Sequence, residues 1–154
     1  LLDSLIVYKG GDWDNSLRGQ LFAFRRLIKK ETACLAASNR TDEQLLAFGN
    51  LLQQEREADC SDPVQLTEID FQFHLLVAQS SGNLVYPLLL NSFKSAYTSY
   101  TRAFFSANIC SVVIQQVFEF HEHLVQAIEN KNVQNSGEIM LAMLKHGEES
   151  WKGA

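Results

Sequence analysis

The chain has little proline, and this scarcity narrows its fold class. Only two of its 154 residues are proline, Pro63 and Pro87. Long stretches also lack the Gly-rich turns that separate the short strands of β-sandwiches and barrels. The composition therefore favours helices over either of those β architectures.

Three features that define other classes of protein are also missing. No apolar run approaches the roughly 20 residues that a membrane-spanning helix needs. Thirteen Lys and Arg face 18 Asp and Glu, and this net charge of -5 argues against a nucleic-acid-binding surface within these residues. The three cysteines are odd in number and lack CxxC spacing, which argues against a disulfide framework and fits a reducing cytosol. We interpret Cys34 as a core residue of a helix, and Cys60 and Cys110 as incidental.

Over most of its length the chain instead shows the 3.6-residue apolar period of amphipathic helices. With its capping and helix-breaking residues, the period predicts six helices, over about residues 15–38, 42–59, 63–80, 84–105, 108–130 and 133–151. A chain of this length can bury one sizeable core. Because the connections are short, we expect an all-α, antiparallel bundle.

One predicted helix carries two polar side chains on its apolar face. Asp70 and His74 are four residues apart, so they lie one above the other, among apolar neighbours. A buried carboxylate is costly unless it is paired or binds a metal. Since His74 alone could supply the pairing, these two residues are compatible with an internal ion pair as well as with a metal site.

Two further helices each carry a histidine on a packed face. His121 shares the apolar stripe of its helix, whereas His123 lies about 200° around the helix and faces water. His146 lies on the packed face of the last helix. A lone inward histidine is more often a core residue than a ligand. Three of them with an aspartate, from three helices, favour Zn, Ni, Mn or Fe over Mg or Ca.

Two arginines are candidates for an inward cation. Arg25 lies on the apolar stripe of the first helix, and Arg102 lies in the aromatic stretch AYTSYTRAFF. An inward guanidinium needs an anion, and its planar fork suits a carboxylate. That carboxylate could belong to the chain itself or to a bound ligand.

Four segments resemble one known family. The run DFQFHLLVAQSSGN, residues 70–83, resembles the D-x-x-F-H…A-S-G-N signature of the C-terminal ligand-binding domain of GntR-superfamily regulators, FadR subfamily. The segments FRRLIKKETACLAAS, HEHLVQAIENKN and MLAMLKHGEES resemble that family's first helix, its H-x5-A-I stretch and its last helix. The resemblance covers about residues 15 to 151 in unbroken order.

The resemblance implies a bundle of six to seven antiparallel helices around an effector cavity. In metal-dependent members, one Asp and three His bind the ion. Carried over by position, these ligands are Asp70, His74, His121 and His146. Arg25 matches an arginine that often anchors an effector carboxylate, Asn83 adjoins the family's pocket, and Arg102 is a further candidate effector contact. The implied effector is a small organic or sugar acid, and zinc is the first choice of metal, with Ni, Mn or Fe as alternatives.

The resemblance also implies a function. Residues 1–11 are expected to end a linker from an N-terminal winged-helix domain, which would make all contact with DNA. Residues 12–154 would form the metal- and effector-binding domain of a cytoplasmic, homodimeric regulator. We expect no enzymatic activity, because the paired Glu-x-x-His motifs of di-iron bundles and the HExxH motif are absent.

Two departures from the family pattern leave an alternative open. Lys29 occupies the position, four residues after Arg25, where the family usually has Glu. The loop ENKNVQNSGE and the stretch of residues 85–105 look more like the fatty acyl-CoA-responsive members, which lack metal histidines at positions 74 and 121. The alternative is therefore a metal-independent sensor of fatty acyl-CoA.

Overall fold

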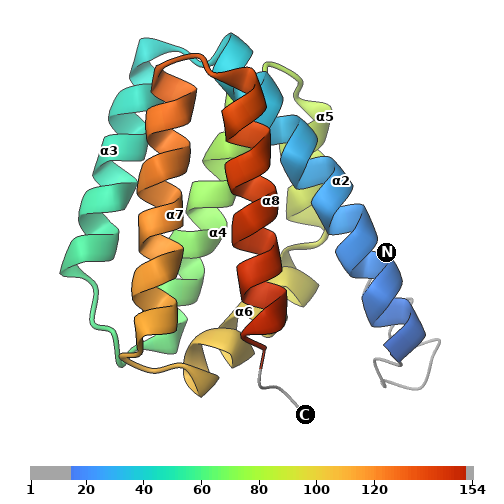
Figure 1. Ribbon diagram of the computed structural model, residues 1–154, viewed down its shortest axis with the longest axis vertical. Helices are drawn as coiled ribbons and strands as arrows, with labels where there is room; N and C mark the ends of the chain where they lie inside the picture. Colours follow the sequence, from blue (N-terminus) through green and yellow to red (C-terminus); the bar gives the residue numbers. More distant parts are fainter. Residues whose placement is uncertain (1–14, 152–154) are drawn as a thin grey trace.

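The computed structural model describes residues 15–151, and side chains from residue 19 onward (Figure 1). The predicted linker over residues 1–11 lies outside the described residues. Within them the helices are α2 (Asn15–Asn39), α3 (Asp42–Glu57), α4 (Pro63–Ser80), α5 (Val85–Ser92), α6 (Lys94–Ala107), α7 (Val112–Glu129) and α8 (Val133–Glu149). The described part contains no strand, which confirms the all-α class. None of its helices combines the length and hydropathy of a membrane span.

Local capping explains where two of these helices begin. The Thr41 side chain accepts a hydrogen bond from the Gln44 backbone N–H, and the Gln44 side chain accepts one from the Thr41 N–H. This reciprocal pair is a capping box and starts α3. Asp62 caps α4 by accepting two N–H groups of its first turn, where Pro63 has no N–H and needs no acceptor. Both predicted starts are confirmed.

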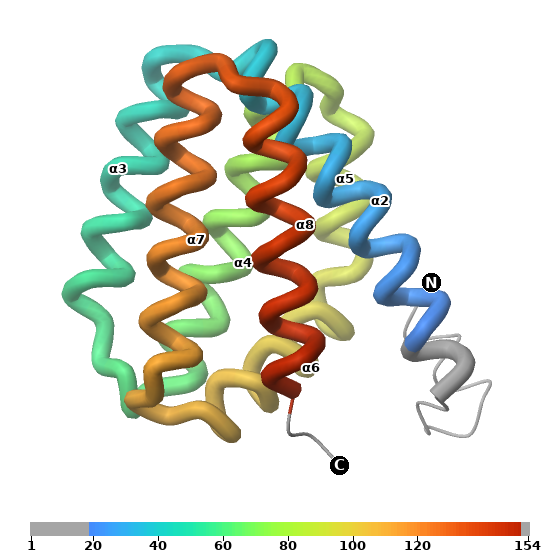
Figure 2. Tube along the Cα trace, in the orientation of Figure 1, coloured from blue at the N-terminus to red at the C-terminus, as the bar shows by residue number. Residues whose placement is uncertain are grey.

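The predicted helix over residues 84–105 is divided in the structure. Phe93, with φ -104° and ψ 6°, separates α5 from α6. Its ring packs edge-on against Phe24 of α2, with the ring centroids 5.6 Å apart. This contact between distant segments is not encoded in the local apolar period, so the pattern predicted one helix. Because of the break, α6 crosses the lower end of the bundle and packs against α4 (Figure 2).

The core lies where α2, α3, α4, α7 and α8 meet. Its fully buried members include Phe48, Phe73, Leu124 and Met140. The helices α2 and α8 pack closely at Gly137, where a Cβ would lie 2.7 Å from the Sγ of Cys34. A larger residue at position 137 would therefore force the Cys34 side chain to move. Cys34 is half-buried beside this crossing rather than inside the core.

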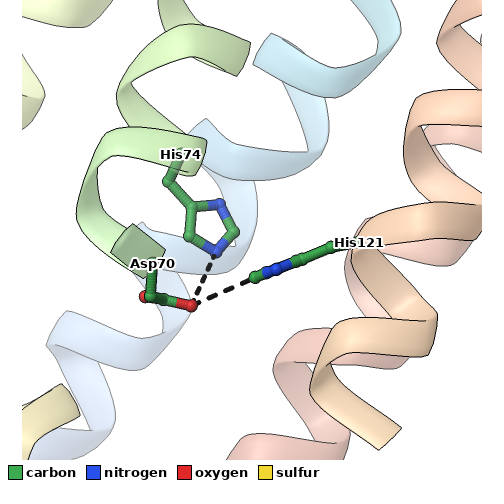
Figure 3. Close-up of side chains that lie close together, drawn as sticks. All are labelled: Asp70, His74 and His121. Carbon is green, nitrogen blue, oxygen red and sulfur yellow. Dashed lines mark ion pairs between the residues drawn. The ribbon is translucent and has the colours of Figure 1, made fainter. Parts of the chain in front are cut away.

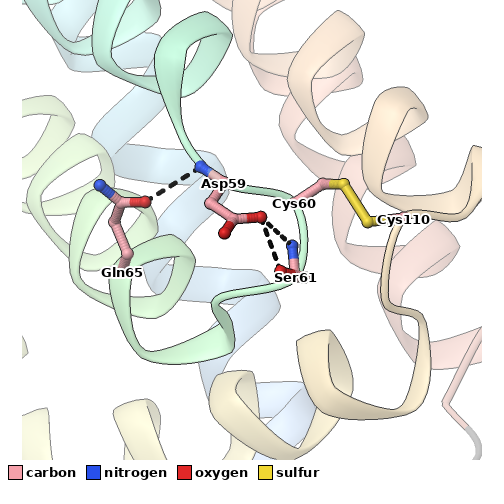
Figure 4. Close-up of a disulfide and its surroundings, with 5 residues drawn as sticks. All are labelled: Asp59, Cys60, Ser61, Gln65 and Cys110. Atoms are coloured by element: carbon pink, nitrogen blue, oxygen red, sulfur yellow. Dashed lines mark hydrogen bonds between the residues drawn. A yellow bond between two sulfur atoms is a disulfide. The ribbon is translucent and has the colours of Figure 1, made fainter.

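Cys60 and Cys110 form a disulfide, so the prediction that they are incidental is wrong (Figure 4). Cys60 lies in the turn between α3 and α4, and Cys110 in the turn between α6 and α7. The Cys110 backbone N–H also donates to the Cys60 carbonyl at 3.4 Å. Fifty positions separate the two cysteines. Their spacing therefore gave no signal, and only the bundle topology brings the two turns together. Both residues are exposed.

Candidate metal centre and adjoining cavity

Asp70, His74 and His121 converge in the interior of the bundle (Figure 3). Asp70 and His74 project from successive turns of α4, and His121 reaches them from α7. The Asp70 Oδ1 lies 3.8 Å from the His74 Nε2 and 3.6 Å from the His121 Nε2. All three side chains are buried, and one ligand atom from each lies within 4.8 Å of the others. Three of the four predicted ligands are thus brought together.

The polar atoms of this cluster fit a bound cation. The Nε2 of His121 is buried without a hydrogen-bond partner among the described residues. Such an orphaned nitrogen is costly, and a metal ion on its lone pair would remove that cost. Two imidazoles and a carboxylate are ligands that suit Zn, Ni, Mn or Fe. Three protein ligands would also leave a coordination position open for water or an effector.

Glu55 of α3 holds His121 in this orientation. Its buried carboxylate hydrogen-bonds the Nδ1 of His121, and the imidazole stacks on Phe73 with the ring centroids 3.9 Å apart. With Nδ1 donating to Glu55, the Nε2 lone pair faces Asp70, an arrangement that orients many metal-binding histidines. The sequence analysis missed Glu55. It falls on the buried stripe of α3 with Phe48 and Leu52, so the same rule that found Asp70 applies to it.

The two histidines differ in their affinity for protons. Burial lowers the pKa of His74 well below its usual value, and the neighbouring cationic groups lower it further. Burial also lowers the pKa of His121, but the carboxylates of Glu55 and Asp70 outweigh it and raise that pKa above its usual value. His74 is therefore neutral and ready to bind a metal at neutral pH, whereas a proton competes for His121.

The structure does not bring His146 to this cluster. Its Nε2 lies 3.3 Å from the carbonyl oxygen of Val113, and its ring packs against Phe120. A small cavity lies beside Asp70 and His74, and the residues of α8 that line it are Met143, Leu144 and Gly147. His146 lies on the neighbouring face of that helix. Its role as the fourth ligand stays a prediction.

The three candidate effector residues lie in different surroundings. Arg25 packs over the Tyr97 ring, 5.6 Å from its centroid, and its Nε and Nη1 have no hydrogen-bond partner among the described residues. Asn83 is exposed, and its Oδ1 accepts a hydrogen bond from the backbone N–H of Val85, the first residue of α5. Arg102 is exposed, so its predicted inward orientation is wrong. The neighbouring Thr101, and not Arg102, lies on the buried side of α6.

Two cavities meet at Arg25. The inner cavity, of about 40 Å³, lies beside Asp70 and His74. The outer cavity, of about 310 Å³, lies between α2, α5 and α6. Arg25 lines both of them, and Tyr97 also stands between them, since it lines the outer cavity and its hydroxyl donates to Asp70 Oδ2.

Lys29 belongs to the inward face of α2, which the sequence analysis did not predict. It lies one turn beyond Arg25, is only 5% exposed and lines the outer cavity. Its Nζ donates to the Tyr97 hydroxyl at 3.1 Å. Burial lowers the pKa of Lys29 well below its ordinary value; Arg25 lowers it further, and Asp70 opposes the change.

A helical bundle with a buried Asp-His-His cluster beside a cation-lined apolar cavity belongs to the class of ligand-binding domains. The FCD domain family matches residues 20–146, and the chain belongs to that family. This assignment confirms the resemblance to the C-terminal domain of GntR-type regulators.

Individual relatives agree with the family assignment. The chain is similar to the HTH-type transcriptional regulator LutR of Bacillus subtilis, with 27% identity over 136 residues, which cover 87% of this chain and 62% of LutR. It is 34% identical over 73 residues to a fatty acid metabolism regulator protein of Shewanella denitrificans, covering 47% of this chain and 28% of that protein. Among solved structures, Streptococcus agalactiae GntR matches with a TM-score of 0.66 and 26% identity, covering 82% of this chain and 55% of that one.

The chain thus spans less than two thirds of the length of each of these relatives. The curated relatives are named as regulators and not as enzymes. These names agree with the expectation of a regulator rather than an enzyme.

Proposed function

We propose that this chain is the sensing part of a bacterial GntR-type transcriptional regulator. In this role it binds a divalent transition metal and a small carboxylate, and these ligands control DNA binding by a separate winged-helix domain. One observation carries the proposal: Asp70, His74 and His121 converge in a buried site, with His121 held by Glu55.

Zinc is the metal that we propose first, because it favours few ligands of the imidazole and carboxylate type. When bound there, the ion would supply a positive charge and an open coordination position. This chain's own residues would hold it: Asp70 and His74 from α4, and His121 from α7. The bound metal would also compensate the buried carboxylate of Asp70, which otherwise has a costly position.

The whole regulator is proposed to be a cytoplasmic homodimer, since paired DNA half-sites are read by two-fold protein pairs. The name of LutR describes an HTH-type protein, and 62% of LutR is covered by this chain, which leaves room for a DNA-binding part in that relative.

Disulfides are rare in a reducing cytosol. The exposed Cys60 and Cys110 would be open to cytosolic reductants.

Metal stoichiometry of the purified chain tests the proposal. After chelation and reconstitution with zinc, the wild-type chain should retain about one ion per chain, as expected for one such site. The variant His121→Ala should retain almost none. The matched control is His123→Ala, because His123 is exposed two residues further along the same helix. Absence of zinc from the wild type, or full retention by His121→Ala, would contradict the proposal.

The same measurement on His146→Ala examines the predicted fourth ligand. A weaker zinc affinity is expected if its imidazole leaves the Val113 carbonyl and joins the metal. An unchanged affinity would remove His146 from the ligand set.

A metal-independent acyl-CoA sensor is the second candidate, and the apolar outer cavity favours it. Long-chain acyl-CoA should then raise the melting temperature of the metal-free chain, while chelators and zinc should leave it unchanged.

A further inference from the structure

The inner and outer cavities differ in what they can hold. A water molecule occupies about 30 Å³ in the liquid. The inner cavity of about 40 Å³ therefore has room for an ion or a water, and not for an organic molecule. The outer cavity of about 310 Å³ reaches the range of roughly 300 Å³ and above in which small-molecule pockets begin. Of these two cavities, only the outer one has room for an organic effector.

The outer cavity has apolar walls and a cationic inner end. Its walls include Leu21, Phe22, Leu89, Leu90, Phe93 and Trp151. Arg25 and Lys29 are the charged residues of its lining, and no Asp or Glu lines it among the described residues. A molecule that matches this cavity has an apolar body and one anionic end.

Within the part of the chain that the structure describes, the two cations have no counter-ion of their own. Lys29 Nζ donates to the neutral hydroxyl of Tyr97, and within the described residues neither Lys29 nor Arg25 takes part in an ion pair. Asp70, the acid that acts on Lys29, lies beyond that hydroxyl. Buried charges are costly unless they are paired. An incoming carboxylate would supply the missing pair to both groups.

We propose that the outer cavity binds a carboxylic acid with an apolar body, whose carboxylate lies between Arg25 and Lys29. This inference rests on the proposed function and names its effector class: amphipathic monoacids, and not sugar acids or polar polyacids. Lys29 is the specificity-determining residue, because it places a second cation at the inner end of an apolar cavity. The acid binds outside the metal compartment, and the Lys29–Tyr97–Asp70 chain of hydrogen bonds connects the two ligands.

Calorimetric titration of the purified chain tests the effector class directly. The probes are octanoate and 4-phenylbutyrate as monoacids, octanamide as a neutral match for octanoate, citrate as a polar polyacid, and octanoyl-CoA. The monoacids should bind, octanamide should bind at least about tenfold more weakly than octanoate because it lacks the charge, and citrate should not bind. Equal affinities for octanamide and octanoate, a preference for citrate, or tighter binding of octanoyl-CoA would each overturn the proposal.

Substitution of Lys29 tests its role. Lys29→Met keeps an unbranched stem and removes the charge, and it should weaken octanoate binding by on the order of tenfold to hundredfold. Octanamide binding should change little in this variant. Lys30→Met is the matched control, since Lys30 is exposed at the next position of the same helix. Unchanged octanoate affinity in folded Lys29→Met, with folding checked by circular dichroism, would contradict the proposal.

Zinc stoichiometry of the same samples separates this inference from the proposed metal centre. Lys29→Met should still bind zinc, because Lys29 is not in the ligand cluster. Octanoate binding by a chain that takes up no zinc would disprove the metal centre and support the acid site. Zinc uptake without binding of either monoacid would disprove the acid site alone.

Discussion

The inner and outer cavities belong to the same bundle, but they are lined by different kinds of side chain. The inner cluster draws Asp70, His74 and His121 from α4 and α7, and Glu55 of α3 fixes one of them. The outer cavity lies among α2, α5 and α6, and it has apolar walls and two cations that form no ion pair within the described residues. Polar groups with fixed partners suit a metal ion with a definite coordination geometry, whereas an apolar cavity accepts ligands of varied shape. One fold can therefore combine a selective site with an adaptable one.

The largest expected difference between the two regions is in packing. Phe73 is fully buried and stacks on His121, so Phe73→Ala should lower the free energy of unfolding by about 3–5 kcal/mol. Leu90→Ala, in the half-buried wall of the outer cavity, should cost about 1 kcal/mol. Urea unfolding of both variants measures the difference, and equal costs would show that the two regions are packed alike.

The disulfide joins the turn between α3 and α4 to the turn between α6 and α7. Replacing both Cys60 and Cys110 by Ser should lower the free energy of unfolding, by about 4 kcal/mol at most for a loop of this length. Thermal unfolding with and without reductant measures the effect. Reductant should have little effect on the double variant, and an equal shift in both proteins would contradict this role.

Glu55 should act on the metal through His121. Glu55→Gln should weaken zinc binding about 10- to 100-fold near pH 8, because the imidazole loses its orienting carboxylate. Because Glu55 raises the pKa of His121, its removal lowers that pKa, and protons then displace the metal only at a lower pH. The acid limit of zinc binding, taken as the pH below which each protein's affinity falls from its own value at pH 8, should therefore move to lower pH. Glu57→Gln, at an exposed position of the same helix, is the control. A weaker affinity with an unmoved acid limit would reduce Glu55 to a packing role.

The two cavities should be energetically coupled. A metal on Asp70 would withdraw the carboxylate charge that acts on Lys29, so zinc should tighten octanoate binding by about fivefold or more. Octanoate should tighten zinc binding by the same factor, because coupling of binding equilibria is reciprocal. Titrations in both orders measure it, and independent binding would show that the cavities act separately.

The smallest expected effect is on stability without ligands. Lys29→Met should raise the free energy of unfolding by on the order of 1 kcal/mol, because a buried cation is replaced by an apolar side chain. The folded state lowers the pKa of Lys29, so the unfolded chain binds this proton more tightly. The gain is therefore complete below the folded pKa and disappears as pH rises through the ordinary value of 10.5. Denaturant titrations at several pH values test this trend, and a gain independent of pH would contradict it.

Helical periodicity predicted the fold better than it predicted the site. Caps at Thr41 and Asp62 are local, so the helices that follow them were predicted from neighbouring residues. The division at Phe93 and the disulfide depend on contacts between distant segments, which no local pattern contains.

In the candidate site, too, some residues could be predicted from the local pattern and others only from the packed structure. Asp70, His74 and His121 lie on apolar stripes and were found by that rule. Lys29 has mostly charged or polar sequence neighbours, so its burial became visible only in the packed bundle. Glu55 lies on the buried stripe of α3, where the same rule could have found it.

The most direct test of the metal centre is a crystal structure of the zinc-loaded chain, with anomalous diffraction data collected at the zinc absorption edge. The expected result is one strong peak between the Asp70 Oδ1, the His74 Nε2 and the His121 Nε2. A peak only at surface residues, or no peak in protein crystallised with excess zinc, would contradict the proposed metal centre.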